Sequence, residues 1–203
     1  TLTASVSSLK IGLAAELPEL RPRFASGTQH IRHAHISPSG ARAVFGFRGD
    51  IITLPAEKGD PRNLTATAGS HEKYPAWSPD GRFIAYFSDE SGEYQLIIAG
   101  QDGKGEPRKF DLDGKGSYAY ITWSPDSKHL VFNDNGRNLY LMEVQSGKIS
   151  LIDSDVLYTP GPFREKFSSW SSDSRWIAYN QITETNFRQV FVYSVDEGKS
   201  YPV

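Results

Sequence analysis

The chain has 203 residues, with 24 acidic and 22 basic side chains and a formal net charge of −2. This balance offers no basic excess to nucleic acid or to an anionic membrane surface, so we expect neither as a partner. Cysteine is absent, which excludes disulfides and thiolate chemistry, and no apolar run approaches the roughly 20 residues that span a bilayer.

Residues 1–29 precede any repeat, and we expect them to form an N-terminal strand and linker region. Val6 to Leu13 favours one strand, and Ala14 to Leu20 is the stretch that could form a turn of helix, limited by its prolines. The polar start of the chain contains no apolar signal region, and because it begins at Thr1 without an initiator methionine, we expect it to be cut from a longer parent. A cytoplasmic location is favoured, and a periplasmic one stays open because the parent's own N-terminus is missing.

One sequence unit then recurs four times without gaps. A Ser-Pro-Asp-Gly-like turn follows a short strand that ends in Trp or Ile, and an apolar, aromatic strand comes after the turn. The turn serines stand 41, 46 and 47 residues apart, at Ser37, Ser78, Ser124 and Ser171. Such spacing is typical of a four-stranded propeller blade.

The repeat predicts an all-β chain: a β-propeller of about four four-stranded antiparallel blades, forming an open partial propeller. The expected blades cover residues 30–69, 70–113, 114–160 and 161–203. Closure of four blades into a small ring is the alternative, because propellers contain about four to eight blades. An open arc leaves two blade faces bare, so we also expect homo-oligomerisation through those faces.

The sequence resembles the tricorn protease family, beyond a general resemblance to TolB-like and prolyl-oligopeptidase-type propellers. The Trp-Ser-Pro-Asp-Gly unit carries the general resemblance, and Asp89-Glu-Ser-Gly-Glu-Tyr94 with Pro55-Ala-Glu-Lys-Gly59 carries the closer one. Further matching segments are residues 19–24, 37–45, 54–65, 74–81 and 86–96. The resemblance implies about four blades of a seven-bladed propeller, in a parent whose S41-type serine peptidase region lies outside this chain.

No residue here is predicted to be catalytic. The four turn serines precede no helix, so we interpret them as turn residues and not as nucleophiles. The turn aspartates Asp80, Asp126 and Asp173 fall in different blades, too far apart for acid–base pairing. His33 and His35 share a strand face and could begin a zinc site with His30, but no carboxylate motif completes it. We therefore expect no metal and no cofactor.

The residues four, five and seven positions before each turn serine form the entry region of the candidate substrate channel. In a propeller the first strand of each blade lies nearest the central channel, and these positions are aromatic and basic. Such a rim could stack on a peptide and attract its carboxylates, whereas the plainer alternative is ordinary packing between blades. The candidates are Arg32, His33, Lys73, Tyr74, Tyr120, Arg164, Lys166 and Phe167.

These observations predict a non-catalytic propeller segment of a tricorn-like serine peptidase. Its expected partners are peptide substrates of the parent and the parent's remaining domains, and its expected task is to guide or filter the peptides. Two alternatives stay open: a TolB-like scaffold for protein–protein contacts, and the propeller cap of a prolyl-oligopeptidase-type hydrolase.

Overall fold

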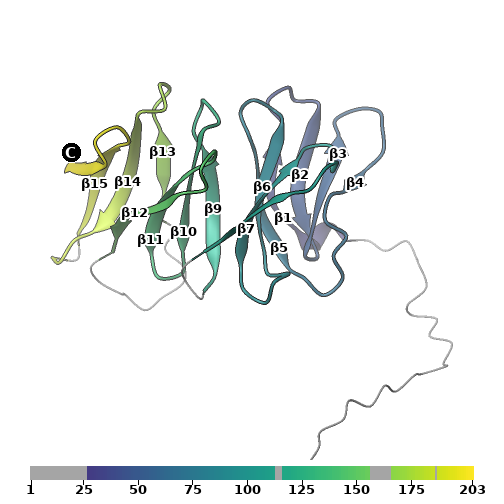
Figure 1. The fold of residues 1–203 in the computed structure, drawn as a ribbon, viewed down its shortest axis with the longest axis horizontal. Helices are drawn as coiled ribbons and strands as arrows, with labels where there is room; N and C mark the ends of the chain where they lie inside the picture. Colours follow the sequence, from purple (N-terminus) through teal and green to yellow (C-terminus); the bar gives the residue numbers. More distant parts are fainter. Residues whose placement is uncertain (1–26, 113–115, 156–165, 186) are drawn as a thin grey trace, which may run out of the picture.

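The computed structural model describes residues 27–112, 116–155, 166–185 and 187–203. The expected strand at 6–13 and helical turn at 14–20 lie outside these residues. Within them, one short 3₁₀ helix, η2 (Thr28–His30), precedes sixteen strands that form four separate four-stranded sheets. Figure 1 shows the sheets side by side in a row, with the first (purple) and the fourth (yellow) at opposite ends.

Each sheet contains four consecutive strands in chain order, and neighbouring strands are antiparallel. The first sheet is β1 (Ile31–Ile36), β2 (Arg42–Phe47), β3 (Asp50–Pro55) and β4 (Arg62–Asn63). The second is β5 (Glu72–Trp77), β6 (Phe83–Ser88), β7 (Gln95–Gly100) and β8 (Arg108–Asp111). The third is β9 (Tyr118–Trp123), β10 (His129–Asp134), β11 (Asn138–Glu143) and β12 (Ile149–Ser154). The fourth is β13 (Ser168–Trp170), β14 (Trp176–Ile182), β15 (Arg188–Ser194) and β16 (Lys199–Pro202).

The repeated serines form the turns between the first two strands of each sheet, as predicted. Ser78 Oγ donates to Asp80 Oδ1 at 2.6 Å and accepts from the Phe83 amide at 3.0 Å. Ser124 repeats the pattern with Asp126, at 2.6 Å. Each hydroxyl thus satisfies the backbone where the strand resumes, which is the role of Ser and Asp in such turns.

Neighbouring sheets meet along their first strands and along their faces. The strand β1 contacts β5, β5 contacts β9, and β9 contacts β13. The first strands therefore lie at one shared inner edge of the row, while the fourth strand of each sheet lies at the opposite edge. This arrangement gives the described residues the architecture of an open partial propeller.

Apolar side chains fill the spaces between consecutive sheets. The largest of these cores lies between the second and third sheets, where Phe87 and Phe132 are fully buried with ring centroids 5.7 Å apart. Val44 and Ile84 anchor the core before it, and Val131 and Ile177 the core after it. Because each sheet is covered mostly by its neighbours, truncating a large core residue should cost about 3–5 kcal/mol.

Polar contacts at matching positions reinforce the second and third of these interfaces. The Trp123 indole N–H donates to the Ala76 carbonyl of the preceding sheet at 3.0 Å, and the Trp170 indole donates to the Thr122 carbonyl at 3.3 Å. The first interface differs, because the Trp77 indole donates within its own turn. At the second and third interfaces, the repeated tryptophan therefore bonds its own sheet to the sheet that precedes it.

The fourth sheet presents an uncovered apolar face. Val190 is 50% exposed, whereas its counterparts Leu96 and Leu139 in the second and third sheets are fully buried. Ala178 is likewise exposed, although the equivalent Ala85 is fully buried. The face that in the other sheets packs on a following sheet is thus open here, which agrees with an open row and not with a closed ring.

Candidate functional site

Three inner strands contain the same irregularity, a one-residue β-bulge. Pairing skips between Arg32 and His35 in β1, and equivalent shifts occur in β5 and β9. The bulged residues are not glycine, yet His33, Tyr74 and Tyr120 have φ values of 53°, 53° and 56°. Non-glycine residues rarely occupy this left-handed region, so three such residues at repeated positions mark the inner edge as specialised.

The bulges bring three rings together in what we call the aromatic row, formed by His33, Tyr74 and Tyr120. The His33 and Tyr74 ring centroids are 3.7 Å apart with planes tilted by 32°, and the Tyr74 and Tyr120 centroids are 5.0 Å apart. Contacts of this kind are worth about 0.5–1.5 kcal/mol each. The row therefore crosses the inner strands of three consecutive sheets.

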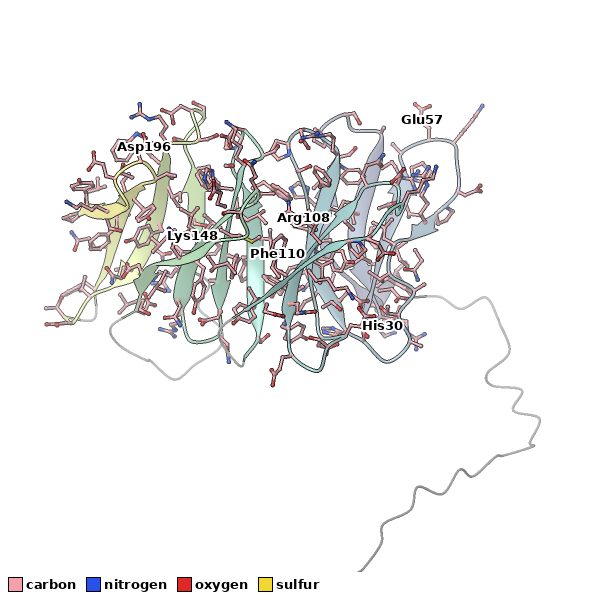
Figure 2. All side chains as sticks on the ribbon, viewed as in Figure 1. His30, Glu57, Arg108, Phe110, Lys148 and Asp196 are labelled. Carbon is pink, nitrogen blue, oxygen red and sulfur yellow. The ribbon has the colours of Figure 1, made fainter. Side chains whose placement is uncertain are left out.

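A cavity of about 600 Å³ opens beside the aromatic row. Figure 2 labels His30, one of its lining residues, at the edge of the first sheet that is opposite to the Glu57 turn. The lining residues are His30, Arg32, His33, Gly46, Arg48, Gly49, His71, Glu72, Lys73, Tyr74, Ser117, Ala119 and Tyr120. They come from the first three sheets, so the cavity exists only because those sheets pack together.

Lys73 is the buried cation of this cavity, with 8% of its surface exposed. Its ammonium donates to Ser117 Oγ at 2.5 Å and lies 3.9 Å from the centroid of the Tyr94 ring. Burial lowers the pKa of Lys73 to about 8, and the nearby Asp89 carboxylate opposes that shift. The amine therefore changes charge close to neutral pH.

Burial also shifts the pKa values of two other titratable groups that line the cavity. Burial lowers the pKa of His33 most strongly, and the charges of Lys73, Arg32 and His71 lower it further. Glu72 is the acidic lining residue, and burial raises its pKa although the Thr67 and Ser88 hydroxyls donate to its Oε1 at 2.7 and 3.1 Å. The cavity thus favours an anionic guest over a cationic one.

The structure gathers five of the eight predicted channel residues around this cavity: Arg32, His33, Lys73, Tyr74 and Tyr120. It places the next two elsewhere. Lys166 is 3% exposed and buried against Asp155, with 3.2 Å between Nζ and Oδ1. Phe167 is 62% exposed and does not line the cavity, and Arg164 lies outside the described residues.

Eight lining residues are absent from the predicted set: His30, Gly46, Arg48, Gly49, His71, Glu72, Ser117 and Ala119. Arg48 lies in the turn after β2, a position that counting back from the turn serines never reaches. His71 and Ser117 stand seven positions before Ser78 and Ser124, so the repeat contained a signal for them that residue type alone did not select.

The prediction that His33 and His35 share one face of the strand is wrong, because the bulge in β1 lies between Arg32 and His35. His33 stacks on Tyr74, whereas His35 Nδ1 accepts from the Trp77 amide at 3.3 Å. Across the described residues, no three His, Cys, Asp or Glu side chains gather as a metal-binding group. No helix in that same part of the chain has the length and apolar character to cross a membrane.

The four sheets packed along their first strands define a β-propeller, and comparison of the sequence identifies its family. The model of the tricorn protease second beta propeller domain matches residues 31–203. The chain therefore belongs to the family of tricorn protease second β-propeller domains. A search among curated proteins finds no match.

Solved structures share the fold at low sequence identity. The crystal structure of the tricorn protease superimposes with a TM-score of 0.67 at 18% identity, covering 84% of this chain and 16% of the other. A putative TolB from Agrobacterium tumefaciens gives 0.63 at 22%, covering 85% of this chain and 61% of that one. TolB from Acinetobacter baumannii gives 0.61 at 18%, covering 84% and 43%. This chain thus spans less than two thirds of each relative.

Proposed function

We propose that this chain is a non-catalytic, peptide-binding propeller segment of a tricorn-like serine peptidase. The cavity beside the aromatic row carries this proposal, because it combines stacked rings with cationic side chains at the inner edge of three sheets. Membership of the tricorn propeller family supports the assignment of the parent. In this proposal the S41-type catalytic residues lie outside the chain, and the propeller guides or filters peptides toward them.

The physical basis of peptide binding is a rigid aromatic surface. The rings of Tyr74 and Tyr120 are held by backbone bulges and by contact with each other, so little side-chain freedom is lost when a peptide stacks on them. Arg32 and Lys73 beside them supply charge for the polar parts of a peptide. Aromatic residues and arginine dominate the binding energy of many protein interfaces.

The test is fluorescence anisotropy with a fluorescein-labelled, unstructured peptide that contains phenylalanine and leucine. Tyr74→Ala should weaken binding by about tenfold, since anchoring residues cost more than about 1 kcal/mol when truncated. Phe187→Ala is the matched control, because Phe187 is an exposed aromatic (74%) directly before β15 and does not line the cavity. Equal affinity of the wild type and Tyr74→Ala, with both folded by circular dichroism, would contradict the proposal.

A second candidate function is a TolB-like scaffold for protein–protein contacts. The favouring observation is that the TolB structures share the fold nearly as closely as the tricorn protease does, with TM-scores of 0.61 and 0.63 against 0.67. The two candidates differ in the ligand that the cavity takes. Binding of a folded protein that survives Tyr74→Ala, together with no affinity for unstructured peptides, would favour the scaffold.

A further inference from the structure

The lining of the cavity contains more basic than acidic side chains. Within the described residues, no carboxylate forms an ion pair within 4.0 Å of Arg32, Arg48 or Lys73. The acidic lining residue Glu72 is 2% exposed and accepts hydrogen bonds from the hydroxyls of Thr67, which lies between β4 and β5, and Ser88 of β6. The basic lining residues are His30, Arg32, His33, Arg48, His71 and Lys73.

The repeat contains a second lysine at the position of Lys73, and comparing the two lysines shows which partner Lys73 does not have among the described residues. Lys166 stands five residues before Ser171, as Lys73 stands five before Ser78, and both are more than nine-tenths buried. Lys166 has carboxylates beside it, with Asp155 at 3.2 Å and Asp153 at 3.9 Å. Lys73 has the Ser117 hydroxyl and the Tyr94 ring instead.

A buried ammonium is costly unless an anion compensates it, and within the described residues only Lys166 of this pair has carboxylates within 4.0 Å. We propose that the cavity binds a carboxylate group of a peptide, which takes the place beside Lys73 that Asp155 takes beside Lys166. This inference rests on the proposed peptide-binding function and adds the chemical group that the cavity selects. Arg32, also a lining residue, is exposed and is the second candidate contact for the same carboxylate.

Proton binding should accompany carboxylate binding. Because burial lowers the pKa of Lys73 to about 8, the amine is mostly neutral above that pH and its attraction for an anion is lost. A bound carboxylate favours the charged amine and therefore raises the pKa of Lys73 in the complex. The affinity is highest below pH 8, and it falls as the pH rises from 8 to that higher pKa. The titratable groups around Lys73 are Arg32, His33 and His71, which line the same cavity, together with the Asp89 carboxylate and the Tyr94 phenol.

The experiment compares three peptides of one sequence by isothermal titration calorimetry. The first has a free C-terminal carboxylate, the second a C-terminal amide, and the third a C-terminal amide with one internal aspartate. Wild-type protein should bind the first about tenfold more tightly than the second, since a hydrogen bond to a charged group contributes about 1.5–3 kcal/mol. The third peptide identifies the source: affinity equal to that of the first means that side-chain carboxylates are accepted, and affinity equal to that of the second means that the terminus is selected.

Two variants and one control test the residues. Lys73→Met and Arg32→Gln should each abolish most of the preference for the acid over the amide, and Lys73→Met should also remove the fall in affinity between pH 7 and 9.5. Lys109→Met is the control, because Lys109 is an exposed lysine paired with Glu90 and does not line the cavity. Because Arg32 is exposed, its variant stays informative even if Lys73→Met is destabilised.

The outcomes separate this inference from the proposed function. If the acid and the amide bind equally while Tyr74→Ala still weakens both, peptide binding stands and the carboxylate proposal is overturned. If no peptide binds, the proposed function itself fails. A preference for the acid that persists in both variants would also overturn the assignment of Lys73 and Arg32.

Discussion

Replacing Lys166 with methionine removes the ammonium from a buried charge cluster between the third and fourth sheets. Its side chain is 2% exposed and faces Asp155, which is 8% exposed and has Arg137 at 3.7 Å as a second cation. Breaking a buried pair from one side costs about 3–5 kcal/mol, because the remaining charge is left uncompensated. Arg137 still neutralises part of the Asp155 charge, so we expect a loss of about 3 kcal/mol of unfolding free energy.

The control for this prediction is Lys109→Met at an exposed pair of shorter distance. Lys109 and Glu90 are 2.7 Å apart, yet their side chains are 45% and 46% exposed, so their pairing should contribute less than about 1 kcal/mol. Urea unfolding followed by tryptophan fluorescence measures both losses, at low salt and in 1 M sodium chloride. High salt should reduce the small effect at Lys109 and leave the effect at Lys166, since buried charges are screened less. Equal losses in the two variants would refute the reasoning.

Three further predictions concern the repeat. Trp123→Phe keeps a ring but loses the indole bond to Ala76, so urea unfolding should show a loss of about 1–3 kcal/mol; no loss would mean that the bond is dispensable. Ser78→Ala removes the hydroxyl that joins Asp80 to the next strand, and the same assay should show a loss of about 1–2 kcal/mol, contradicted by an unchanged midpoint. Val190→Asp on the open face should abolish concentration-dependent association in sedimentation velocity while changing stability by less than about 0.5 kcal/mol. If Val190→Asp still self-associates, the contact between copies does not involve this face.

The sequence was sufficient to predict the sheets because local signals and the repeat agree. Each turn serine follows a first strand that ends at Ile36, Trp77, Trp123 or Trp170, and the structure ends β1, β5, β9 and β13 at those residues. Turn chemistry and strand propensity depend on neighbouring residues, so four aligned copies reinforce one another. The match to the tricorn propeller family confirms the resemblance that these residues suggested.

The site was only partly predictable, because its geometry depends on contacts between sheets. The bulges place His33, Tyr74 and Tyr120 in left-handed conformations. Because these positions are not glycine, the sequence contained no sign of that conformation. Lys73 and Lys166 are equivalent by position, yet one faces the cavity and the other faces Asp155. The difference arises because Asp153 and Asp155 lie beside Lys166. The spacing of the repeats in the sequence does not give the distance between a lysine and such carboxylates.

The three residues in left-handed conformations lower the stability of the fold, yet they supply the rings of the aromatic row. A non-glycine residue in this conformation costs roughly 1 kcal/mol or more, which glycine avoids. His33→Gly would relieve that cost at an exposed position and would remove the first ring of the aromatic row. A library selected only for heat resistance should therefore accumulate glycine at this edge and lose its ligands, so engineering of this propeller requires selection for binding at every round.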